Sequence, residues 1–123
     1  MASIKPEVNG EILTIHINEL RLLDEMTIQG VYKDIVTVLE KTQEPNVILH
    51  FGRVNFMSSS ALGMLIRVNK KCKEFKITLK LSNISPTIRE VFKITGLEKI
   101  FDIHEDAAQA AETFKKGGFF FRK

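Results

Sequence analysis

The stretch Asn46–Val68, NVILHFGRVNFMSSSALGMLIRV, decides the expected fold. It opens with Val47–Phe51, an apolar run with little polar alternation, which predicts a central strand covered on both faces. Three consecutive serines, Ser58, Ser59 and Ser60, then stand directly before a helical pattern. Free backbone N–H groups and the positive end of the helix dipole gather at a helix start, so this place suits a phosphoryl group. A serine here is also typical of a plain helix cap.

The chain before this stretch predicts a hairpin and a helix. Asn9-Gly10 is a strong signal for a tight turn between strands at residues 3–8 and 11–17. Residues 18–23 are expected to form a loop. A helix over about residues 24–41 follows, because Asp24 suits an N-cap and the apolar side chains recur at spacings of three and four.

The chain after the serines continues the alternation of helices and strands. Its expected helices cover about residues 60–73, Ser85–Gly96 and 105–115, and its expected strands cover 77–81 and 100–103. The order ββαβαβαβα predicts an α/β fold: a mixed, mostly parallel sheet with an N-terminal hairpin and about four helices.

Composition narrows the function classes. The chain has 123 residues, 44% hydrophobic and 27% charged, with a net charge of +3, as expected for one globular domain. So small a basic excess, without an aromatic-studded strand, does not favour direct binding of nucleic acid. The single Cys72 is expected to be buried, and the three scattered histidines have no metal-ligand spacing, so neither a metal nor a cofactor is expected. The lack of a signal-length or membrane-spanning apolar run predicts a cytoplasmic protein.

The segment Phe56–Gly63, FMSSSALG, resembles the signature Phe-Met-Asp-Ser-Ser-Gly-Leu-Gly of bacterial anti-sigma factor antagonists, the STAS-domain family. The Ser85-Pro86 helix that ends in Gly-Leu is similar as well. The resemblance covers residues 3–114 and leaves 115–123 as a basic aromatic tail. Two positions depart from the signature: Ser58 replaces the aspartate and Ala61 replaces the glycine that follows the second serine.

The resemblance implies a binding module and not an enzyme. Its partner would be an anti-sigma factor, often a serine kinase, and a protein serine phosphatase would reverse the modification. The phosphorylated serine of the family falls on Ser60, with Ser59 as the fallback. The expected partner contacts are Met57, Ser58, Ser59, Ser60, Ala61 and Met64.

Some residues have a competing structural interpretation. Phe56 is expected in the core, and His50 is expected to be a core histidine rather than a base. No Ser/His/Asp triad can be argued from the histidine positions, which agrees with a protein that is not an enzyme.

A second function is kept open beside the first. The chain could be a STAS adaptor subunit of a membrane transport or lipid-trafficking complex that is not phosphorylated. The missing aspartate and the tail with Phe119–Phe121 favour this alternative, in which the tail would contact a membrane. The Ser59-Ser60 pair favours the antagonist.

Overall fold

The computed structural model describes the backbone of residues 3–121 and the side chains of residues 3–114. Strands and helices alternate along the chain, and one 3-10 turn, η1, follows the third helix. The elements are β1 (Ile4–Asn9), β2 (Ile12–Ile17), β3 (Arg21–Leu22), α1 (Glu25–Lys41), β4 (Asn46–His50), β5 (Phe56–Met57), α2 (Ser59–Glu74), β6 (Thr78–Ser82), α3 (Pro86–Thr95), η1 (Leu97–Lys99), β7 (Asp102–His104) and α4 (Ala107–Phe121).

Within the described residues, one five-stranded sheet has the order β1-β2-β4-β6-β7. Only β1 runs antiparallel to its neighbour, and the strands β2, β4, β6 and β7 are parallel. This arrangement confirms the predicted mixed sheet with an N-terminal hairpin. The turn differs by one residue: Asn9 pairs with Ile12, so Gly10 and Glu11 form it, and Gly10 adopts a φ of 67° that favours glycine.

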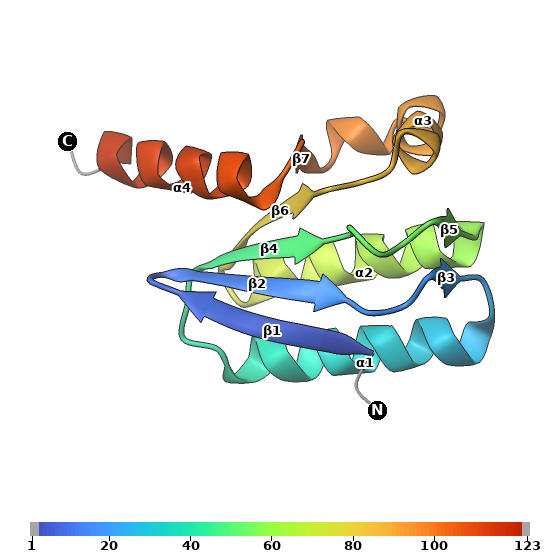
Figure 1. The fold of residues 1–123 in the computed structure, drawn as a ribbon. Helices are drawn as coiled ribbons and strands as arrows, with labels where there is room; N and C mark the ends of the chain where they lie inside the picture. The colour runs from blue at the N-terminus through green and yellow to red at the C-terminus, as the bar shows by residue number, and fades with distance from the viewer. Residues whose placement is uncertain (1–2, 122–123) are drawn as a thin grey trace.

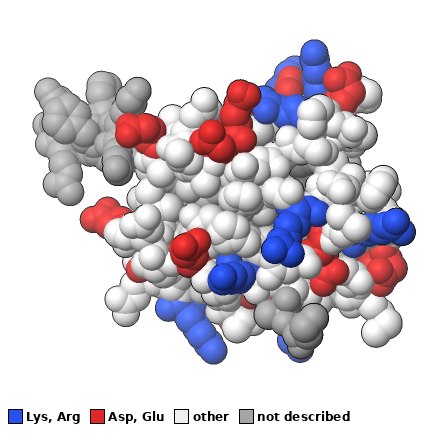
Figure 2. All heavy atoms as spheres, viewed as in Figure 1, with Lys and Arg blue, Asp and Glu red and all other residues white. Residues whose placement is uncertain are grey.

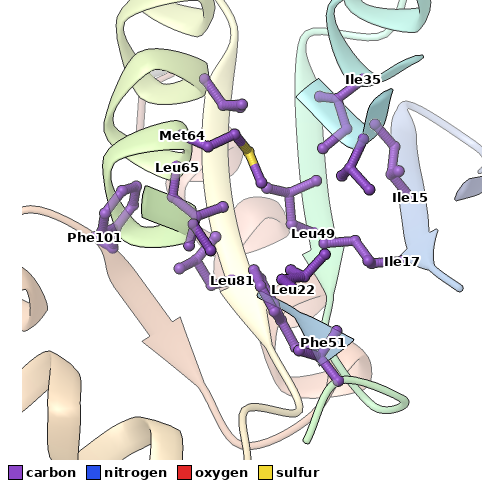
Figure 3. Close-up of a cluster of buried hydrophobic side chains, with 14 of the residues drawn as sticks. Ile15, Ile17, Leu22, Ile35, Leu49, Phe51, Met64, Leu65, Leu81 and Phe101 are labelled. Carbon is purple, nitrogen blue, oxygen red and sulfur yellow. The ribbon is translucent and has the colours of Figure 1, made fainter. Parts of the chain in front are cut away.

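Two layers of helices enclose the sheet (Figure 1). Helices α1 and α2 cover one face, while α4 crosses the other, where Ala110 and Phe114 pack on Ile48. The main core lies on the α1–α2 face and contains Ile15, Leu49 and Leu81 among its largest members (Figure 3). The apolar stripe that spacings of three and four predict on each helix is largely buried, and Cys72 belongs to that of α2. Burial raises the pKa of the Cys72 thiol to about 12, so it stays a protonated core residue.

The helix ends follow the predicted capping chemistry. The Asp24 carboxylate accepts a hydrogen bond from the Thr27 N–H at 3.0 Å and caps α1. Ser85 caps α3 with Pro86 in the first turn. Helix α3 ends at Gly96, whose φ of 80° forms the left-handed cap that a glycine at a helix end predicts.

Three expectations about elements were wrong. The predicted loop at residues 18–23 contains β3, and a second short strand, β5, precedes the serines. The spacing of Ile88, Val91 and Phe92 predicts that all three lie on the inner face of α3, but Val91 is 38% exposed. Helix α4 continues to Phe121 and so includes most of the predicted tail. The expected membrane contact of the Phe119–Phe121 side chains lies outside the described side chains.

Candidate functional site

The three serines lie where a small second sheet joins the starts of two helices. Strand β3 pairs in parallel with β5, Arg21 opposite Phe56 and Leu22 opposite Met57. Figure 1 shows this pair at the end of the molecule where α1 and α2 both begin. The Ser58 N–H donates to the Leu22 carbonyl at 2.9 Å, so β3 fixes the residue that opens α2.

The structure divides the three serines into two roles. Ser58 is the N-cap of α2, with extended backbone, and its Oγ accepts from the Ala61 N–H at 3.2 Å. Ser59 and Ser60 form the first turn, and both are exposed. Within the described residues, neither of their hydroxyls is in a hydrogen bond. The capping interpretation therefore applies to Ser58, and two free hydroxyls remain at the positive end of the helix.

Two of the expected partner contacts are core residues instead. Ala61 and Met64 are fully buried, and Met64 extends from α2 toward Leu49 (Figure 3). Both therefore lie out of reach of a partner. Helix α2 packs against α1 as well as against the sheet, so its buried arc is wider than the predicted stripe.

The neighbouring aromatic residue was also misassigned, in the opposite direction. Phe56 was expected in the core but is 50% exposed, while Met57 is half-buried and packs against the core. Successive strand residues point to opposite faces, so β5 can bury only one of the two.

Exposed apolar side chains lie on the elements that adjoin the start of α2, and most of them were not predicted. They come from the flanks of β3, the first turn of α1 and β5. We call them the apolar patch: Leu20, Leu23, Met26 and Phe56, which are 52%, 49%, 86% and 50% exposed. The run Leu20–Leu23 was predicted to be a loop. Its apolar composition was the signal from which these exposed side chains could have been predicted. A solvent-exposed cluster of this kind typically marks a protein contact.

The charges at the start of α2 suit an added anion, whereas the neighbouring start of α1 carries the acidic Asp24 and Glu25. The first turn of α2 carries no acidic residue. The Arg21 guanidinium lies 5.3 Å from the centre of the Phe56 ring, beside the apolar patch. Asp24, at the start of α1, is held ionised because the hydrogen bond from the Thr27 backbone lowers the pKa of its carboxyl.

On the face in Figure 2, positive and negative side chains alternate around a broad uncharged band. Among the described residues, no group of three His, Cys, Asp or Glu could hold a metal ion. Over the same residues, no helix combines the length and apolar character needed to cross a membrane.

Comparison with known proteins places these features in one family. Residues 3–110 match the STAS domain. Over 72 residues the chain is 35% identical to "Putative anti-sigma factor antagonist BtrV" of Bordetella bronchiseptica, covering 58% of this chain and 62% of that protein. Over 50 residues it is 40% identical to the anti-sigma-B factor antagonist of Bacillus subtilis, covering 41% of this chain and 46% of that protein. The matches thus span less than two thirds of either relative.

The fold has solved counterparts as well. The structure of the Bacillus cell fate determinant SpoIIAA in its phosphorylated form matches with a TM-score of 0.65 at 23% identity, over 90% of this chain and 98% of that one. This likeness concerns the fold. With a domain match over most of its length and the predicted arrangement of elements, the chain belongs to the STAS domain family.

Proposed function

We propose that this chain is an anti-sigma factor antagonist that binds an anti-sigma factor through the start of α2 and the apolar patch. One observation carries the proposal: the exposed Ser59 and Ser60 stand on a capped helix start, and the adjoining β3, α1 and β5 region carries four exposed apolar side chains. The apolar patch supplies docking area, and the serines supply a place for control. The names of both relatives support the same class of function.

The proposed control is reversible phosphorylation of Ser60, with Ser59 as the second candidate. A phosphate adds about −1.5 to −2 charges at neutral pH. In the free protein, the start of α2 stabilises that charge by roughly 0.3–1 kcal/mol. Against a packed partner surface, burying an unpaired anion costs several kcal/mol. The cost at the interface exceeds the gain in the helix, so the fold is kept while docking is lost.

The proposed switch assigns different roles to the chain, a kinase and a phosphatase. An anti-sigma factor with serine kinase activity adds the phosphate, and a protein serine phosphatase removes it. The chain itself acts as a binding module without catalysis of its own. The proposed compartment is the cytoplasm, where sigma factors work.

Capture from the host tests the proposal. The chain, tagged and immobilised, is exposed to lysate of its native host, and bound proteins are identified by mass spectrometry. We expect an ATPase-like kinase that, once purified, phosphorylates the chain with ATP at Ser60. Ser60→Ala should abolish that incorporation, while Thr87→Ala on α3 should leave it intact. Full phosphate incorporation into Ser60→Ala would assign the phosphorylation site to Ser59. No phosphate incorporation into the unmodified chain would overturn the proposed switch.

One observation favours the adaptor alternative. Ser58 occupies the place of the family aspartate, so the acceptor serine lacks a carboxylate beside it. A STAS adaptor of a membrane transport or lipid-trafficking complex would need no such group. Capture of a transporter ATPase, with no phosphate on the chain isolated from its host, would favour the adaptor over the antagonist.

A further inference from the structure

All three histidines of the chain lie in one row across the sheet. The register pairs Lys5 with His16, His16 with His50, His50 with Ser82, and Ser82 with His104. The row crosses the carboxyl ends of the parallel strands. His50, the last residue of β4, is at its centre and opens the loop that leads to β5 and the serines.

His50 closes this loop through a ring nitrogen. The Gly52 N–H donates to His50 Nδ1 at 3.1 Å. A nitrogen that accepts this bond carries no proton, so the neutral ring has its proton on Nε2. The bond spans two residues, as in an Asx-turn, in which a side-chain oxygen takes the same place.

Gly52 allows this contact because it has no side chain. A Cβ at position 52 would lie 2.6 Å from His50 Cε1 and 3.1 Å from Nδ1. Any larger residue would therefore push the imidazole away from the backbone N–H. We call this arrangement the His50–Gly52 clasp.

The groups around the clasp oppose a charged ring. The His16 ring centre is 4.5 Å from that of His50, and His16 Nε2 lies 3.1 Å from Glu7 Oε1. Burial lowers the pKa of His50 and the charge of His16 lowers it further, while a backbone hydrogen bond and the charge of Glu7 act in the other direction without reversing the shift. Lys5 and Arg53 line the same hollow, and β6 contributes the non-titrating Ser82.

The loop beyond the clasp holds the candidate site in place. The Val54 N–H donates to the Phe51 carbonyl at 2.9 Å and completes the turn. The Asn55 N–H then donates to Leu20 at 2.9 Å, before Ser58 bonds to Leu22. The clasp therefore stands at the start of a short path from β4 to the cap of α2 that backbone hydrogen bonds hold at Val54, Asn55 and Ser58.

We propose that neutral His50 is a positioning residue that holds residues 51–58 in the docking arrangement, and that its protonation releases them. Protonation of Nδ1 replaces the acceptor by a donor facing the Gly52 N–H, so the clasp opens. The consequence for docking, weaker partner binding in acid, rests on the proposed function. The loop itself can be tested without a partner.

The sign follows from the lowered pKa. The released loop leaves His50 with a pKa near the ordinary value of about 6.5, while the closed loop holds it lower. The released form therefore binds more protons, and the closed form is favoured less as the pH falls below about 6.5. The loss ends once the pH passes the lowered value. The equilibrium constant for closing the loop falls by roughly tenfold for each pKa unit that separates the pKa of His50 in the released loop from that in the closed loop.

NMR on the full chain between pH 5 and 8 provides the test. The readouts are the His50 imidazole titration and the hydrogen-exchange protection factors of the Asn55, Phe56 and Ser58 amides. Protection factors remove the intrinsic pH dependence of exchange. We expect protection at all three amides to fall with acid, over the window set by the pKa of His50.

Three variants separate the clasp from general acid sensitivity. His50→Asn keeps an acceptor for the Gly52 N–H without titrating, so protection should stay high across the range. Gly52→Ala displaces the ring, so protection should be low throughout. His16→Gln removes the repelling neighbour and should move the midpoint to higher pH.

The proposal would be overturned if the protection factors of the three amides did not change over the pH range in which His50 titrates. It would also be overturned if His50→Asn kept the pH dependence of the unmodified chain. These results come from the free protein, whereas the proposed function is tested by partner capture. Each idea can therefore fail alone.

Discussion

Helices α2 and α3 start with the same local chemistry and differ in what surrounds it. Ser58 Oγ accepts from the Ala61 N–H at 3.2 Å, and Ser85 Oγ accepts from the Ile88 N–H at 3.3 Å. Both helices also carry an exposed hydroxyl residue two positions after the cap, Ser60 in α2 and Thr87 in α3.

The difference lies in the neighbours. The start of α2 is tied to β3 through Ser58 and is bordered by the apolar patch. The start of α3 opens with Pro86, and its exposed apolar residues, such as Ile94, lie toward the other end of the helix. Capping is thus structural at both places, and only the α2 start combines free hydroxyls with a docking surface.

The largest expected effect comes from adding a negative charge at the start of α2 and, for comparison, at the start of α3. Ser60→Asp should weaken binding to the captured anti-sigma factor by hundreds-fold or more, because an unpaired buried anion costs several kcal/mol and each ~1.4 kcal/mol is tenfold. Thr87→Asp adds the same charge at the matching position of α3 and should leave binding unchanged. Titration calorimetry measures both. Equal loss in the two variants would show that net charge, not position, is responsible.

The next effect tests the correction to the buried face of α2. Met64→Ala should lower the free energy of unfolding by about 2–5 kcal/mol, because it empties part of the core. Ile66→Ala, on the outer side of the same helix, should change it by less than about 0.5 kcal/mol. Urea unfolding measures both. A stable Met64→Ala protein with weakened partner binding would restore the original assignment of this residue to the interface.

The two caps should cost equal amounts when removed. Ser58→Ala and Ser85→Ala should each reduce stability by roughly 1 kcal/mol, since each leaves a helix N–H without its acceptor. Thermal unfolding of both variants provides the comparison. A much larger loss in Ser58→Ala would mean that its hydroxyl does more than cap the helix.

The smallest expected effect comes from restoring the family aspartate. Ser58→Asp should add about 0.3–1 kcal/mol of stability near neutral pH, because a carboxylate favours the start of a helix. Its folded pKa should be lowered, as it is for the Asp24 cap of α1. The gain is then present above the ordinary aspartate pKa of about 3.9 and disappears as the pH falls through the lowered value. A gain that persists in acid would contradict the charge mechanism.

The sequence predicted the elements whose signals are local. Asp24, Ser85 and Gly96 were placed correctly, because capping depends on a few neighbouring residues. The mostly parallel sheet with an N-terminal hairpin was also predicted, because single helices between strands require crossovers. Strands β3 and β5 were missed, since two-residue strands show no periodicity and owe their existence to each other.

The candidate site was predicted in part for the same reason. Ser58–Ser60 were located by a local motif. The burial of Met64 depends on how α2 packs against α1, and the exposure of Phe56 depends on which side of β5 meets the core. The row that joins His16, His50 and His104 depends on the register of distant strands, which no local pattern records.

The central claim concerns one phosphate at the first turn of α2. The most direct test measures the affinity of the captured anti-sigma factor for the chain before and after enzymatic phosphorylation at Ser60, verified by peptide mass spectrometry. The account predicts a loss of hundreds-fold or more, with the melting temperature nearly unchanged. Equal affinity for the two forms would contradict it.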